Sequence, residues 1–422
     1  MRTLAQIAQI ARRTKFWSKP AQGTADYGPE GHGSFTRSLS LPDAEQLVHI
    51  PICSTTPDDE ECARLRMLGQ FLARQDRWSD LAAKIRMAEQ GRSKTPGGMP
   101  VTDLLVFGAR HDVVAAATHA IEDGVPSGAP ALLSGIGGLE AVLSEHNTDA
   151  AIALIVASAH IDIGWAWRGS EAERDVAKHR RAAFAAHFDR ASTILDKFNG
   201  VELNSPALAA ARCALLPGLR DPHVRIADDY EDLIDLDPHN ERHMRAMGNH
   251  LLPRWFGSYE QLELEARRTA SRTQDIWGDA GYSWVMFDAL ANDAGACDIV
   301  DVSFFIDGLR DILRRRPGQV SANLLAAYCA LSIMRHGPEL PAAQEISACA
   351  DWIIRDYMTE LHPLIWAHAA EGFDNAVPVT SLSRFAAHGQ ARALGVLRDL
   401  FEDEIAQGLQ IVFTPDGLQI NA

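Results

Sequence analysis

The 422-residue sequence lacks the short motifs that mark several large enzyme classes. It has no Gly-x-Ser-x-Gly nucleophile elbow and no His-Glu-x-x-His zinc motif. The glycine cluster Gly135-Ile-Gly137-Gly138 has no Gly-Lys-Ser/Thr ending and no clear preceding strand, so we interpret it as a helix-breaking turn rather than a phosphate loop. These absences favour a non-enzymatic protein and leave catalytic activity an open question.

The chain also has fewer basic than acidic residues. The chain has 40 Lys and Arg against 56 Asp and Glu, which gives a formal net charge of -16. An acidic surface repels phosphate backbones, so we expect no nucleic-acid partner. The six cysteines include no Cys-x-x-Cys pair, which predicts reduced, buried thiols and no cofactor: Cys53, Cys62, Cys213, Cys297, Cys329 and Cys349.

Long hydrophobic runs are missing as well. The most apolar run, Ala151 to Ala159, is too short to cross a bilayer. Residues 1–17 have the spacing of a basic amphipathic helix, not of a secretion signal, and could contact either an anionic membrane or the acidic body of the protein. We predict a cytoplasmic protein.

The remaining sequence has the pattern of helices separated by turns. Residues 18–55 are rich in Gly, Ser and Pro and predict a flexible linker. A helix start at Thr56-Pro57-Asp58-Asp59 opens a set of N-terminal helical hairpins over residues 56–123. A Gly/Pro-rich break is predicted over residues 124–138.

Residues 139–407 predict a C-terminal array of helical repeats. Ser205-Pro206, Asp221-Pro222 and Asp237-Pro238 each pair a capping residue with a proline, and the prolines lie 16 residues apart. Two such segments take 32 residues, close to a tetratricopeptide repeat. Residues 408–422 have two β-prone runs around Thr-Pro-Asp-Gly and predict a hairpin, the only appreciable β structure. The predicted fold is therefore an all-α solenoid of antiparallel hairpins with a short C-terminal β-hairpin.

One corner resembles known sequences. Tyr230 to Arg254 joins two amphipathic helices through Leu-Asp-Pro-His-Asn, and it resembles the junction between tetratricopeptide-like hairpins. Pro253-Arg-Trp-Phe-Gly-Ser258 also resembles a bacterial domain family of unknown function whose members carry Pro-Arg-Trp-Gly-Gly-Ser between two helices of such a fold. The resemblance covers about residues 200–290, with Phe256 in place of the first glycine. The resemblance implies a fold and no activity. Within this corner, Gly257 can take the left-handed conformation that ends a helix, and Ser258 with Gln261 predicts a capping box for the next helix.

The same region supplies the strongest candidate metal ligands. His239 and His243 are four residues apart, the spacing that lets two imidazoles on one helix face bind one Zn²⁺, and His250 could add a third nitrogen. Glu241 would be the base of a metal-assisted hydrolase, although in zinc proteases the glutamate directly follows the first histidine. The other interpretation is that His239, in the first turn after a cap, is simply exposed and that the spacing alone does not make a site.

A second candidate is the stretch from His160 to Trp167. His160, Asp162, Trp165 and Trp167 could line a pocket, but residues two apart on a helix point in different directions. We therefore interpret this stretch as a helix end whose tryptophans pack on the core.

Aromatic residues and one arginine crowd the region after the corner. Such clusters anchor partners on helical repeat proteins, and they also form packing between repeats. The candidate partner-binding residues are Arg254, Trp255, Phe256, Tyr259, Trp277, Tyr282 and Trp284. Our predicted function is a scaffold that binds another protein or peptide, with the metal-assisted hydrolase as the alternative.

Overall fold

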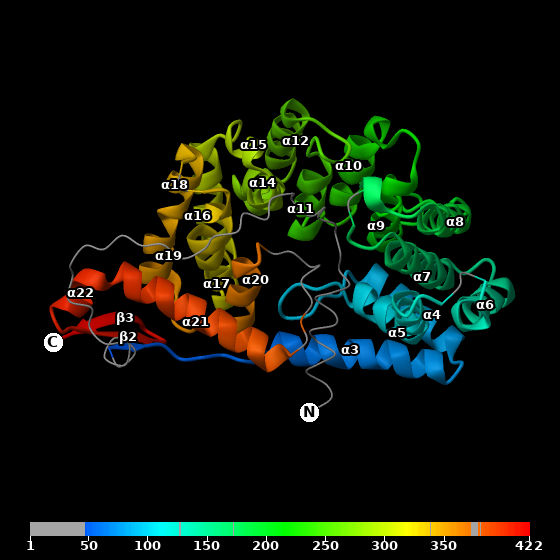
Figure 1. The fold of residues 1–422 in the computed structure, drawn as a ribbon, viewed down its shortest axis with the longest axis horizontal. Helices are drawn as coiled ribbons and strands as arrows, with labels where there is room; N and C mark the ends of the chain where they lie inside the picture. The colour runs from blue at the N-terminus through cyan, green and yellow to red at the C-terminus, as the bar shows by residue number, and fades with distance from the viewer. Residues whose placement is uncertain (1–46, 126–127, 172, 338, 373–378, 380) are drawn as a thin grey trace. The chain divides into compact units, whose positions relative to one another are not determined.

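The computed structural model describes residues 47–125, 128–171, 173–337, 339–372, 379 and 381–422. The predicted basic helix over residues 1–17 and most of the predicted linker lie outside these residues. The chain divides into two compact units, residues 55–289 and residues 1–54 with 290–422. Figure 1 shows the elements of both units.

The first helix of the 55–289 unit begins where the sequence predicts. Thr56 caps α3 (Pro57–Arg74) by accepting from the Asp59 backbone N–H, and the Asp59 carboxylate accepts in return from the Thr56 backbone N–H. This reciprocal capping box satisfies two donors that would otherwise be unpaired at the helix end. Pro57 occupies the first helical position, where a missing N–H costs nothing.

The 55–289 unit is built of helices that pack mainly on helices one or two places away in the sequence, such as α3 on α5, α5 on α7 and α7 on α8. Their continuous apolar faces form its core. After α3 the α-helices are α4 (Trp78–Gln90), α5 (Val101–Glu122), α6 (Pro130–Glu145), α7 (Ala150–Arg168), α8 (Lys178–Leu195), α9 (Pro206–Cys213), α10 (Ile226–Leu236), α11 (Glu241–His250), α12 (Tyr259–Arg272), α13 (Gln274–Trp277) and α14 (Ala280–Asn292), which runs three residues past the division. Short 3-10 turns lie at Glu173–Asp175, Leu216–Gly218 and Pro222–Val224.

The predicted break over residues 124–138 is wrong for most of its length. A turn does follow α5, with Gly124 at φ +73°, but α6 begins at Pro130 and runs through Gly135, Gly137 and Gly138. Leu132, Ile136, Leu139 and Leu143 are buried at helical spacing, and their burial outweighs the low helix propensity of glycine.

The predicted proline corners are partly right. Ser205 caps α9 with Pro206 at its start, as predicted. Pro222 starts only a short 3-10 turn. Pro238 lies in the turn before α11, whose cap is Asn240 and not Asp237. Gly257 does not adopt the predicted left-handed conformation; a Cβ there would lie 2.3 Å from the Leu251 carbonyl oxygen, so close packing explains this glycine.

The second unit combines helices with a small sheet. Its helical elements are α15 (Ala294–Cys297), α16 (Val302–Arg315), α17 (Gln319–Ala327), η4 (Tyr328–Ser332), η5 (Ile333–His336), α18 (Pro341–Ser347), α19 (Cys349–Tyr357), α20 (Pro363–Ala370), α21 (Leu382–Leu400) and α22 (Glu402–Ala406). The predicted hairpin is confirmed, because β2 (Gln410–Thr414) pairs antiparallel with β3 (Gly417–Asn421). It is not the only β structure: β1 (Val48–His49), inside the predicted linker, pairs parallel with β2.

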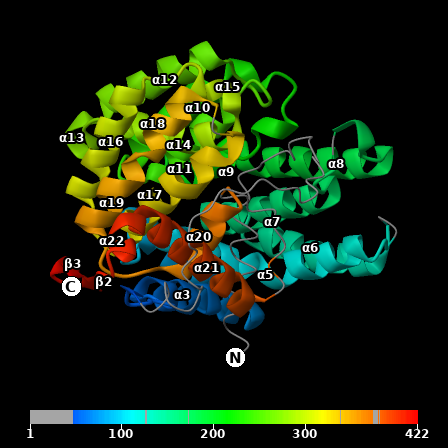
Figure 2. The ribbon, with the colours of Figure 1, turned by 60° about the vertical axis from the view of Figure 1, so that its left-hand side comes forward.

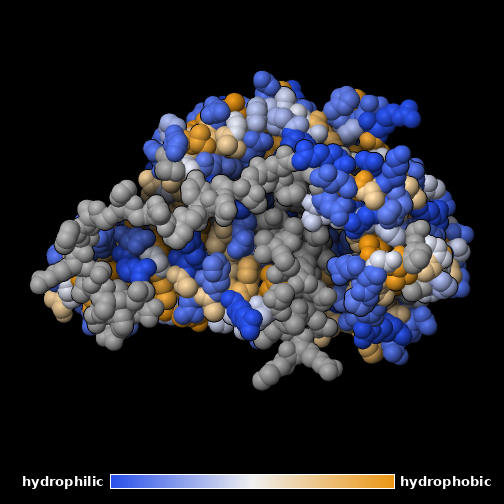
Figure 3. Space-filling model, viewed as in Figure 1, coloured by the Kyte–Doolittle hydropathy of each residue, from blue (hydrophilic) through white to orange (hydrophobic). Residues whose placement is uncertain are grey.

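The predominance of helix, with a small C-terminal strand pair, confirms the all-α prediction. On the face in Figure 3, hydrophilic residues dominate the coloured surface and hydrophobic ones form small separate patches. Within the described residues, one helix, α7, is long and apolar enough to cross a membrane, and it extends well past the nine-residue run seen in the sequence. Because 72% of its apolar window is buried inside the protein, it has the character of a core helix.

Candidate functional site

The histidines of the corner do not gather around one point. His239 lies in the turn before α11, whereas His243 and His250 are buried within α11. His243 Nε2 is 3.0 Å from Asn240 Nδ2, and His250 Nδ1 is 2.9 Å from the Tyr230 hydroxyl oxygen. Each buried imidazole therefore has its own partner.

The electrostatics of these histidines agree with a structural role. Burial lowers the pKa of His243 to about 4 and that of His250 to about 3, so both are neutral near pH 7. Across the described ranges, the three histidines do not bring their ring nitrogens within 4.8 Å of one another. Glu241, in the first turn of α11, consequently has no three-histidine centre to serve. The predicted ligand set of the hydrolase does not form.

Three of the predicted partner-binding residues are core residues. Trp277, Tyr282 and Trp284 are at most 3% exposed. Trp277 Nε1 donates to the Pro238 carbonyl at 2.7 Å, and the Tyr282 hydroxyl donates to Glu263 at 2.6 Å. For these three, packing between helices is the correct interpretation, since a partner cannot reach them without rearrangement.

The other four residues, Arg254, Trp255, Phe256 and Tyr259, remain partly exposed, and we refer to them as the aromatic corner. The corner has a defined backbone, because Trp255 N–H donates to the Leu252 carbonyl at 2.8 Å and Phe256 N–H to the His250 carbonyl at 3.1 Å. The Arg254 guanidinium donates to Asn249 Oδ1 at 3.0 Å. The Trp255 and Phe256 rings lie 5.6 Å apart, centroid to centroid. These contacts define the backbone of the aromatic corner and leave its large side chains partly exposed.

His160 and Asp162 point to different neighbours, as helix geometry requires. The Asp162 carboxylate accepts from Arg110 of α5 at 2.9 Å. The ring of Trp165 packs on Phe184 and Phe188 of α8, with centroids 5.0 and 5.7 Å away. The tryptophan thus covers the core, and His160 and Asp162 do not line one pocket.

His160 instead belongs to a polar cluster that joins α6, α7 and α8, which lie side by side in Figure 2. Its Nε2 is 2.9 Å from Glu140 Oε1, and its Nδ1 is 2.9 Å from His187 Nδ1. Arg190 donates two hydrogen bonds to the Glu140 carboxylate, and this arginine lowers the pKa of Glu140. Burial lowers the pKa of His187 to about 4. The sequence gives no sign of this cluster, because its members lie 3 to 50 residues apart on three helices.

A small pocket with several charged residues in its lining lies beside His243 in the 55–289 unit. It is lined by residues that include Glu89, Arg92, Lys94, Asp103, Asp237 and His243. Lys94 Nζ is 2.8 Å from Asp237 Oδ1, and Ser205 donates to Glu89. Burial raises the pKa of Glu89. Much of the pocket's charge is thus already paired within the protein.

One other group has metal-ligand chemistry. In the part of the chain that the structure describes, Cys53, Glu360 and His362 form the one set of three donor atoms within 4.8 Å of one another. The set is not recognisable in the sequence, since Cys53 lies 307 positions before Glu360. In the sequence, only the alternation Glu360-Leu-His362 indicates that two donors lie on the same side of an extended segment.

No protein-family model, curated protein or solved structure matches this chain.

Proposed function

We propose that the protein is an α-helical scaffold of tetratricopeptide-like hairpins that binds another protein or peptide through the aromatic corner. The proposal includes a cytoplasmic location and no nucleic-acid partner, in line with the formal net charge of -16. It assigns no catalytic step.

The spacing of the helices around the corner supports the repeat part of this proposal. From the start of α9 at Pro206 to the start of α11 at Glu241 there are 35 positions, and from the start of α10 at Ile226 to that of α12 at Tyr259 there are 33. Tetratricopeptide repeats take about 34 residues. α9 packs on α10, α10 on α11 and α11 on α12, the neighbour-to-neighbour order of a helical repeat.

The binding part depends on a single observation: the aromatic corner is partly exposed and already ordered. Tryptophan, tyrosine and arginine dominate the energy of protein interfaces because they bury large areas and few rotamers have to be fixed. The backbone hydrogen bonds of Trp255 and Phe256 fix the corner before a partner arrives. Less ordering entropy is then lost on binding.

Site-specific photo-crosslinking in the source cell tests the proposal. A photoreactive phenylalanine analogue at Tyr259 should give a defined adduct with one polypeptide. The same analogue at Trp352, a half-buried tryptophan of α19 near Arg310, serves as the matched control and should not give that adduct. Equal adducts at both positions, or none at Tyr259, would contradict the proposal.

A second test measures the affinity of the protein for the crosslinked polypeptide, once that polypeptide is identified. Trp255→Ala should weaken its affinity about tenfold or more, the loss expected of a central interface residue. Trp352→Ala should leave the affinity unchanged. Isothermal titration calorimetry measures both affinities. Equal affinity of the two variants would contradict the assignment of the aromatic corner as the binding surface.

A further inference from the structure

We propose that Cys53, Glu360 and His362 bind one Zn²⁺ ion. The site lies within the second unit and is independent of the aromatic corner. It would attach the segment that carries β1 to the loop between α19 and α20.

The donor atoms are close to the arrangement that zinc requires. His362 Nε2 lies 2.9 Å from Glu360 Oε1, and the Cys53 Sγ is within 4.8 Å of one donor atom of each of these residues. Zinc–ligand distances of about 2.0–2.3 Å in a tetrahedron place donor atoms roughly 3.3–3.8 Å apart. Shifts of about 1 Å or less in side-chain position would complete such a geometry.

Backbone pairing brings the distant cysteine to the loop. Cys53 N–H donates to the Leu361 carbonyl at 2.8 Å, and Leu361 N–H donates to the Pro51 carbonyl at 2.8 Å. Leu361, the residue between the two loop ligands, pairs with Ile52 in this short parallel bridge, so Cys53 lies one residue past the pair, on the His362 side. The juxtaposition does not depend on side-chain rotamers.

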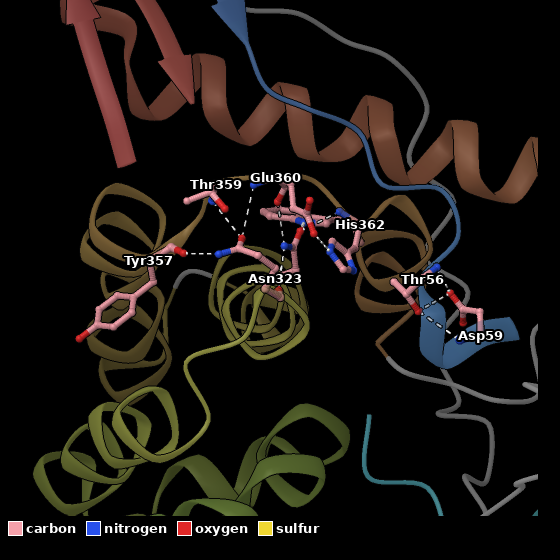
Figure 4. A network of polar contacts seen from close by, with 9 residues as sticks. Thr56, Asp59, Asn323, Tyr357, Thr359, Glu360 and His362 are labelled. Atoms are coloured by element: carbon pink, nitrogen blue, oxygen red, sulfur yellow. Dashed lines mark hydrogen bonds and ion pairs between the residues drawn. The ribbon is translucent and has the colours of Figure 1, made fainter. Parts of the chain in front are cut away.

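Two amide side chains of α17 hold the loop in place (Figure 4). Gln319 Oε1 accepts from Thr359 N–H at 2.9 Å, and its Nε2 donates to the Tyr357 carbonyl at 2.8 Å. Asn323 Oδ1 accepts from His362 N–H at 2.9 Å, while its Nδ2 donates to the Glu360 carbonyl at 2.9 Å.

Asn323 is fully buried, and Trp366 Nε1 donates to the same Oδ1 at 2.9 Å. Asn323 thus hydrogen-bonds the backbone of both loop ligands, and its burial fixes the position of that backbone. The loop is therefore shaped before any ion binds.

The donor set selects the metal. A thiolate, an imidazole and a carboxylate together suit Zn²⁺, whereas Mg²⁺ and Ca²⁺ prefer oxygen donors alone. Binding would deprotonate the Cys53 thiol and release its proton to solvent. Three protein ligands and one water would fill the tetrahedral shell of the ion. Of the protein ligands, His362 is 6% exposed and Glu360 is half-buried.

Metal analysis of the full-length protein tests the site. Purified protein dialysed against Zn²⁺ should retain one zinc per chain by inductively coupled plasma mass spectrometry. Replacement by Co²⁺ should give the near-ultraviolet thiolate-to-cobalt charge-transfer band. Cys53→Ser should abolish that band, and His362→Gln should lower zinc retention at least tenfold.

Matched controls separate ligation from general damage. Cys297→Ser removes a buried thiol of the same unit, and Glu345→Gln removes an exposed carboxylate of α18. Both should retain zinc and the cobalt band. Should His362→Gln fail to fold, as judged by circular dichroism, Cys53→Ser with its smaller change of one atom decides the question. Zinc retention that is equal in wild type and Cys53→Ser, or no retention by wild type, would overturn the proposal.

Discussion

At the scale of single residues, helix packing can be tested with two glycines, one in close contact with a neighbouring helix and one exposed to solvent. A Cβ at Gly248 of α11 would lie 1.8 Å from the Val285 carbonyl oxygen of α14, so the two helices approach through this glycine. We expect Gly248→Ala to destabilise the 55–289 unit by about 1–3 kcal/mol, because backbone has to move. Urea denaturation followed by tryptophan fluorescence measures the change.

The control is Gly137 of α6. A Cβ there would have no heavy atom within 4 Å apart from its chain neighbours and the backbone of its own helix, and the residue is exposed. Gly137→Ala should therefore stabilise the helix by about 0.5–1 kcal/mol through propensity alone. If the two alanine variants changed the urea midpoint in the same direction, the proposed close approach at Gly248 would be wrong.

Caps and glycines show which features of single residues can be predicted from the sequence. The capping positions Thr56, Ser205 and Ser258 were identified correctly, because a cap is a local hydrogen bond between residues three apart. Gly257 and the glycines of α6 were misinterpreted. Only the neighbouring helix decides whether a glycine ends a helix, fits a contact or is merely tolerated.

At the scale of elements, the polar cluster of α6, α7 and α8 supports a second stability prediction. Glu140 accepts two hydrogen bonds from Arg190 and contacts His160, all on other helices. Glu140→Ala leaves the buried His160 without that partner and should destabilise the unit by about 1–3 kcal/mol. Urea denaturation can again measure the loss.

Glu145→Ala is the control, because this exposed residue belongs to the same helix α6. It should change stability by less than about 0.5 kcal/mol, as most surface substitutions do. Equal effects of the two variants would mean that Glu140 contributes only as an ordinary surface carboxylate.

The elements themselves were predictable where the signal was local. Helix periodicity and the Thr-Pro-Asp-Gly turn gave the helices and the C-terminal hairpin. β1 was missed because a two-residue strand has no period, and its partner Ile411 is more than 360 residues away. The hydrogen-bond partner that makes Val48 a strand residue is not visible in the local sequence.

At the scale of the whole molecule, the candidate sites were less predictable than the fold. The spacing of His239 and His243 suggested ligands, but tertiary packing gave His243 and His250 separate buried partners. Cys53, Glu360 and His362 lack any shared motif, since a strand-like contact between distant segments brings them together. A site assembled by topology can be recognised only once the topology is known.

Buried histidines should make the stability of the 55–289 unit fall as the pH is lowered. His187 and His243 have pKa values lowered to about 4, and His250 to about 3, chiefly through burial. In the unfolded chain their pKa is about 6.5. The unfolded state therefore binds more protons below that pH, and stability present above about pH 6.5 is lost as the pH falls toward 4.

His250→Asn tests this, because an asparagine amide can still hydrogen-bond to the Tyr230 hydroxyl but does not titrate. The variant should lose stability at neutral pH through the cavity it creates, but its stability should fall by about 1.4 kcal/mol less per pH unit between about pH 6 and pH 4. Hydrogen exchange of the α10 and α11 amides, corrected for intrinsic rates, follows this unit separately. His119→Asn changes an exposed histidine of α5 and should leave the slope as in wild type. If His250→Asn also kept the wild-type slope, His250 would not be held neutral in the folded state.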